Sequence, residues 1–181
     1  VDTLILQRQT YRVYIRGNKM KVTPDFVDYL SQCIASEYFY IQEKYKNSKI
    51  IGCEVIVDGD VVSAFIRFSL KTKDDLSKLQ WGDFNHDIYL TSKESLSLNY
   101  SMVKFGKDFL KFNEEDGGLG DQNEIRDRNI EVYINGLINA KKITSSDAIF
   151  YFCEDGEEKL KILSLPKING DSYLVNEYLR L

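Results

Sequence analysis

Acidic side chains gather between Glu114 and Arg128, in the stretch EEDGGLGDQNEIRDR. Closely spaced carboxylates can hold a divalent cation, or they can form a surface that docks a basic partner. A calcium loop needs oxygen ligands at fixed alternating offsets, and the glycines of this stretch remove the ligands from its middle. We therefore interpret the stretch as a surface loop followed by a capped, solvated helix face. The partner-binding candidates of this stretch and of the helix that follows are Glu114, Glu115, Asp116, Asp127 and Glu131.

Other carboxylates allow a metal-dependent nuclease as an alternative. Restriction-type nucleases place an aspartate and an acid-x-Lys motif on neighbouring strands, where two carboxylates hold Mg²⁺ and the lysine contacts water or phosphate. The motif here would be SLK at 69–71, with serine in place of the acid and a glutamate supplied from elsewhere. The candidate catalytic residues are Asp58, Asp60, Lys71, Glu37 and Glu43. Because Asp58-Gly59 also fits a hairpin turn, we rank this alternative second, and Mg²⁺ is expected as a cofactor only under it.

Histidine and cysteine offer no recognisable catalytic or zinc-binding set. The lone histidine, His86, lies in a polar loop, and no serine or cysteine stands in a nucleophile motif beside it. Cys33, Cys53 and Cys153 are far apart and form no CxxC pair. Their apolar surroundings favour buried free thiols in a reducing cytoplasm, so we expect a cytoplasmic protein without a resident cofactor.

The first 23 residues form a basic segment in an otherwise acidic chain. They carry five basic side chains against one acid, whereas the whole chain has a net charge of −4. That net charge argues against a general nucleic-acid binder, although a mixture of arginine and tyrosine can bind single strands or acidic proteins. The partner-binding candidates of this segment are Arg12, Tyr14, Arg16, Lys19 and Lys21.

Length and composition indicate one globular domain over residues 1–181. The hydrophobic fraction of 43% and the charged fraction of 29% are ordinary for a folded chain. The apolar runs are all too short to span a membrane, so no membrane association is expected.

Hydrophobic periodicity predicts two helices. The first is a long central helix over about 24–46, with Thr23 as its N-cap, Pro24 in its first turn, and Leu30 and Ile34 buried. The second is an amphipathic helix over about 122–141. Its predicted buried stripe is Ile130, Tyr133, Ile134, Leu137 and Ile138.

Alternation of apolar and polar residues predicts strands and hairpins. Three hairpins are expected, with turns at Gly17-Asn18, Asp58-Gly59 and Asp155-Gly156. Weaker patterns suggest a short helix at DDLSKLQW, strands at DIYLTS and SLSLNYSMV, and a helix or edge strand in the tail. Together these elements predict an α+β fold with a mainly antiparallel sheet of hairpins.

These features favour a non-catalytic recognition protein, of the inhibitor or toxin-neutralising kind, that binds a protein partner through charged and aromatic surface. The magnesium-dependent nuclease is the alternative from another class. A nucleic-acid-binding accessory domain that uses the basic N-terminal segment is a third hypothesis.

Overall fold

The computed structural model describes residues 22–59, 61–72, 100–116, 122–154 and 158–178. Residues 1–21, which hold the five basic side chains of the N-terminal segment, lie outside the described residues. So do Asp60, the region 73–99 that contains His86, and the glycine-rich stretch 117–121. In chain order the elements are α1 (Val22–Lys44), β1 (Ser48–Val57), β2 (Ala64–Thr72), α3 (Tyr100–Asp116), α4 (Gln122–Thr144), β3 (Ile149–Glu154), α5 (Lys159–Asn169) and α6 (Tyr173–Tyr178).

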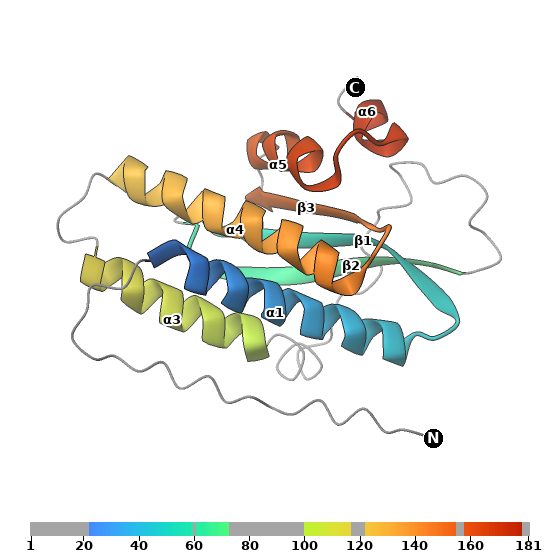
Figure 1. Ribbon diagram of the computed structural model, residues 1–181, viewed down its shortest axis with the longest axis horizontal. Coiled ribbons are helices and arrows are strands. Elements are labelled where there is room, and N and C mark those ends of the chain that lie inside the picture. Colours follow the sequence, from blue (N-terminus) through green and yellow to red (C-terminus); the bar gives the residue numbers. More distant parts are fainter. Residues whose placement is uncertain (1–21, 60, 73–99, 117–121, 155–157, 179–181) are drawn as a thin grey trace.

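The sheet of the described residues has three strands in the order β2-β1-β3 (Figure 1). Strand β1 pairs antiparallel with β2, as the predicted hairpin requires, and parallel with β3. The α+β class is therefore confirmed. The sheet is mixed, however, because β3 is reached through helices and not through a hairpin turn.

The connection between β1 and β2 is longer than a two-residue turn. It spans residues 58–63, so Val62 lies in the loop and not in the strand. The Asp58 carboxylate accepts hydrogen bonds from the Val62 amide at 3.1 Å and from the Ser63 hydroxyl at 2.5 Å. Val61 is fully buried with a positive φ of 54°, a strained conformation for a β-branched residue. Burial of Val61 and Val62 in the core explains why the loop widens and folds inward.

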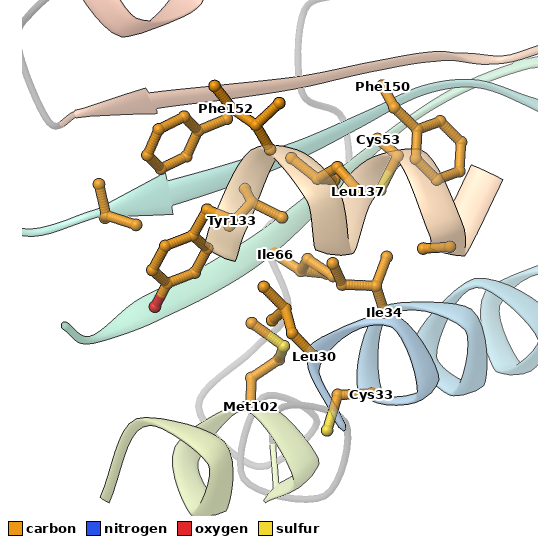
Figure 2. Packing of buried hydrophobic residues seen from close by; sticks show 14 of the residues in the cluster. Leu30, Cys33, Ile34, Cys53, Ile66, Met102, Tyr133, Leu137, Phe150 and Phe152 are labelled. Carbon is orange, nitrogen blue, oxygen red and sulfur yellow. The ribbon is translucent and has the colours of Figure 1, made fainter. Parts of the chain in front are cut away.

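Helices α1, α3 and α4 lie together on one face of the sheet (Figure 1). Helices α1 and α4 run side by side in the same direction. Leu30 of α1 contacts Gly136 of α4, and further along the chain in both cases the Tyr38 hydroxyl hydrogen-bonds the Ser146 hydroxyl at 2.8 Å. Leu30 and Ile34 are both fully buried, as predicted (Figure 2). The helix begins two residues earlier than expected, so the N-cap assignment of Thr23 is wrong.

The predicted stripe of α4 is buried at Ile130, Tyr133, Ile134 and Leu137, whereas the prediction is wrong for Ile138, which is only half-buried. Tyr133 lies in the middle of this stripe. Its ring stacks on Phe152 of β3, with ring centroids 5.3 Å apart, and meets the edges of Phe105 and Phe109 of α3 (Figure 2 shows Tyr133 and Phe152). Its hydroxyl donates a hydrogen bond of 2.9 Å to the Val62 carbonyl. One side chain thus joins α4, α3, β3 and the β1–β2 loop.

Two strand predictions are wrong. The third hairpin, at Asp155-Gly156, is replaced by β3 followed by helix α5. The alternation in KLKIL suggested a strand, but the buried side chains of this segment are Leu160, Ser164, Leu165 and Ile168, a helical spacing.

The predicted strand SLSLNYSMV also gives way to helix, from Tyr100 onward. Phe105, Phe109 and Phe112 follow at i, i+4 and i+7, and their ring contacts with Phe26 of α1 stabilise α3. Because α3 runs to Asp116, the first three acids of the stretch predicted to be a loop are helical. The tail forms the short helix α6.

Gly136 sets how closely α1 and α4 approach. A Cβ atom at this position would lie 2.7 Å from Leu30 Cδ2 and 3.0 Å from Leu30 Cγ. We predict that Gly136→Ala destabilises the fold by about 1–3 kcal/mol, because overpacking outweighs the higher helix propensity of alanine. Gly106→Ala in α3 is the matched control. Its nearest contact would be an ordinary 3.7 Å, so a gain of about 0.5–1 kcal/mol is expected in urea unfolding. Equal effects of the two variants would contradict the packing argument.

Tyr133→Phe should test the hydroxyl bond to the hairpin loop. The ring contacts would stay, but the buried Val62 carbonyl would lose its donor, and we predict a loss of about 1–3 kcal/mol in the free energy of unfolding. Hydrogen exchange of the Val61 and Val62 amides should accelerate more than that of β3. An unchanged unfolding midpoint would show that the hydroxyl does not hold the loop.

Candidate functional site

The face of the sheet opposite α1 carries a buried polar cluster. Glu54 of β1 lies between Arg67 of β2 and Tyr151 of β3 in the strand register, and Cys153 follows on the same face of β3. Glu54 is 5% exposed and Tyr151 is 1% exposed. Helix α5 approaches this face, since the Lys161 ammonium lies 5.2 Å from the centre of the Tyr151 ring.

The two carboxylate oxygens of Glu54 face different partners. Cys153 Sγ donates a hydrogen bond of 3.2 Å to Oε1, and Arg67 Nε lies 3.4 Å from Oε2. A buried carboxylate needs such partners, because removing a charge from water is otherwise costly. The cluster therefore fixes a charged group inside the sheet.

Burial raises the pKa of the Cys153 thiol to about 12, and the nearby negative charge of Glu54 adds to the shift. Burial likewise raises the pKa of the Tyr151 phenol, with Glu54 as the second cause. A protonated thiol is a hydrogen-bond donor and a poor nucleophile. Cys153 is thus suited to holding Glu54, not to covalent catalysis at neutral pH.

The set of residues that the nuclease alternative needs is not brought together. Asp58 lies at the start of the β1–β2 loop, whereas Lys71 pairs with Lys49 at the far end of β2. Lys71 follows Ala64, which lies beside the loop, by seven residue steps along the strand, or about 23 Å. Asp60, the other candidate aspartate, lies outside the described residues.

The two supplementary glutamates of that alternative lie on α1. Glu37 is buried on this helix, which covers the face of the sheet opposite Glu54. Glu43 is exposed and pairs with Lys46 at 2.5 Å. Among the described residues, no three His, Cys, Asp or Glu side chains lie close enough to hold a metal ion.

The acidic partner-binding candidates fall on two helices. Glu114 and Glu115 are exposed at the end of α3, where Glu115 lies 3.8 Å from Lys111. Asp127 and Glu131 are exposed one turn apart on α4. The two groups lie near each other, because Arg128 of α4 donates a hydrogen bond of 2.7 Å to Asn113 of α3.

Glu131 also lines a groove between α4 and α5, of about 450 Å³. Its lining residues are Glu131, Ile134, Asn135, Ile138 and Lys167. The groove and the Glu54 cluster lie on different parts of the molecule. We place the candidate binding site at the groove, since the cluster is buried and its charged groups are engaged with one another.

Sequence reasoning missed Glu54, Arg67 and Lys167. A lone acid within the apolar run IIGCEVIV was the available signal for Glu54, and the hairpin register then places Arg67 directly opposite it. Lys167 gave no local signal, because only the packing of α5 on α4 places it at the groove that Glu131 also lines.

Comparisons with models of known protein families, with curated proteins and with solved structures find no match to this chain. In the part of the chain that the structure describes, no helix is both long and apolar enough to cross a membrane.

The Cys153 thiol should make stability fall at alkaline pH. In the unfolded chain a thiol ionises near pH 8.5, whereas in the fold its pKa is raised to about 12. Above about pH 8.5 the unfolded state therefore binds fewer protons than the folded state, and the unfolding free energy should decrease as the pH rises toward 12. Urea unfolding between pH 7 and 10.5 measures this decrease. Cys153→Ser keeps a donor for Glu54 but does not titrate, so its decrease should be smaller; an identical pH profile would refute the assignment.

Proposed function

We propose that this chain is a protein-recognition domain and that the groove between α4 and α5 is its docking surface. The observation that carries the proposal is an apolar floor between an acidic side chain of α4, Glu131, and a basic side chain of α5, Lys167. The expected cytoplasmic location is part of the same proposal, because the three cysteines are free and a reducing compartment keeps them so.

The floor of the groove is made of Ile134 and Ile138, one turn apart on α4. Leu163, one turn before Lys167 on α5, is 40% exposed and extends the apolar surface along the other helix. Apolar side chains at a concave surface release water when a partner covers them, which favours binding.

The walls carry charges that the fold leaves free. Glu131 of α4 and Lys167 of α5 line the groove, and both are exposed. Asp127, one turn before Glu131, and Lys159, two turns before Lys167, are exposed on the same two helices. Within the described residues, none of the four makes an ion pair or a hydrogen bond through its side chain. Unpaired charges at the rim of an apolar surface are suited to choosing and orienting a partner.

The occupant that fits this arrangement is an amphipathic helix of another protein. Its apolar ridge would lie on the two isoleucines, with basic residues on the flank that faces α4 and acidic residues on the flank that faces α5. Inhibitors and toxin-neutralising proteins bind partners through surfaces of this type, and the basic residues Arg12 and Arg16 remain a second proposed contact.

Three helical peptides with one leucine ridge test the groove. The first has lysines on one flank and glutamates on the other, the second has lysines on both flanks, and the third has glutamates on both. We predict that the mixed peptide binds best, and that its backbone amide shifts map to α4 and α5. Replacing half-buried Ile138 by Glu should weaken all three peptides by about tenfold or more, because the change places a charge in the apolar floor.

Charge reversals then distinguish the two walls. Glu131→Lys makes both charges that line the groove basic and should shift the preference toward the all-glutamate peptide, by a factor of about 1.5–5 for each rim charge. Lys167→Glu should shift it to the all-lysine peptide. Lys111→Glu on α3 is the matched control and should change no preference. Amide shifts outside α4 and α5, or affinities unaffected by Ile138→Glu, would contradict the proposed docking surface.

A further inference from the structure

The outer edge of β3 is closed by side chains of α5 instead of by another strand. Asn169 accepts a hydrogen bond from the Phe150 amide at 2.9 Å and donates one to the Phe150 carbonyl at 2.7 Å. Ser164 makes the same pair of bonds with Phe152, accepting at 3.1 Å and donating at 3.0 Å. The helix thus imitates a neighbouring strand at the positions where β3 turns its backbone away from β1.

Asn169 is fully committed to this role. Its amide nitrogen also donates to the Leu165 carbonyl at 2.8 Å, and its oxygen also accepts from the Lys141 ammonium of α4 at 2.8 Å. All four hydrogen-bonding sites of the side-chain amide are therefore used. The bond from Lys141 ties the contact to α4 as well.

Helix α5 is weak in its own right. Its N-cap, Glu158, makes no side-chain capping bond, and its first turn holds Lys159 and Lys161, whose charge opposes the helix dipole. Pro166 stands inside the helix and removes a backbone donor. The helix therefore depends on its contacts with β3 and on the burial of its apolar side chains.

We propose that α5 is a removable cap and that the edge of β3 beneath it is a docking site for β3 of a second copy of this chain. The edge is self-complementary. When two β3 strands run antiparallel about a two-fold axis at Tyr151, Phe150 of each copy faces Phe152 of the other. Each facing pair exchanges both backbone bonds, so the four groups that α5 satisfies are satisfied again.

The sequence of β3 suits such pairing. Residues 149–152 are Ile-Phe-Tyr-Phe, apolar or aromatic and without charge, a composition that pairs readily when an edge is open. In the same register Glu154 faces the uncharged Ala148. The inference does not depend on the groove, because it rests on the hydrogen bonds of Ser164 and Asn169 with β3.

Native-state hydrogen exchange of the wild-type chain tests the cap. The amides of Phe150 and Phe152 should exchange together with those of α5, at lower denaturant than the amides of Cys53 and Val55 in the central strand. If the amides of β3 and α5 exchange only when the whole chain unfolds, as those of the central strand do, α5 is not removable and the proposal is wrong.

The double variant Ser164→Ala/Asn169→Ala tests the docking site. It removes the cap bonds but keeps the apolar side chains of α5. Sedimentation should show a dimer with an association constant at least about tenfold above that of the wild type. In a mixed sample of labelled and unlabelled chains, contacts between Tyr151 backbones of the two copies should report the two-fold register. Ser36→Ala/Asn47→Ala removes the same chemical groups from exposed positions and should stay like the wild type.

Asn169→Ala alone provides the test if the double variant does not fold. In this variant the Phe150 amide should exchange rapidly at low protein concentration. It should become protected again as the protein concentration rises, because two β3 edges then pair. A variant that remains monomeric while its edge amides exchange freely, or that forms open-ended aggregates without the two-fold contacts, would overturn the proposal.

Discussion

The fold depends on the burial of Tyr133. Its ring is the contact at which α4 meets both α3 and β3, and its hydroxyl supplies the donor for a carbonyl in the β1–β2 loop. An aromatic ring with a polar tip can join an apolar core to backbone that would otherwise lack a partner. The strained Val61 is tolerated next to this bond, because the surrounding contacts determine the path of the loop.

A second constraint acts at the edge of the sheet. A parallel strand such as β3 cannot be closed by a tight hairpin to β1, and its outer backbone groups still need partners. Ser164 and Asn169 provide these partners from a helix. The same arrangement positions Lys161 over Tyr151 and closes one side of the Glu54 cluster. The packing of α5 therefore both closes the edge of β3 and helps to bury the charged Glu54 cluster.

The sequence predicts the features whose cause is local. The helical period of α1 and α4 identifies Leu30, Ile34 and the stripe around Tyr133 correctly, because one buried face recurs every 3.6 residues. The segment KLKIL has a strand-like pattern, yet it is helical. As a helix, α5 buries Leu165 and Ile168, and Asn169 can hydrogen-bond the backbone of β3. Likewise, the partners of Glu54 and the groove beside Glu131 arise from strand pairing and helix packing. Neither is encoded by the spacing of neighbouring residues.

Helix α5 connects the two proposals, because it borders the groove and also caps the edge of β3. Lys167 lines the groove and exposed Leu163 lies one turn before it, whereas Ser164 and Asn169 hold β3. All four side chains lie in a helix of 11 residues. A partner helix in the groove would bind only while α5 is in place, so its binding would stabilise the cap by linkage. Pairing of two β3 edges requires the cap to leave, which removes one wall of the groove. Binding a partner and pairing with a second copy would therefore exclude each other, and each would weaken the other by the same factor.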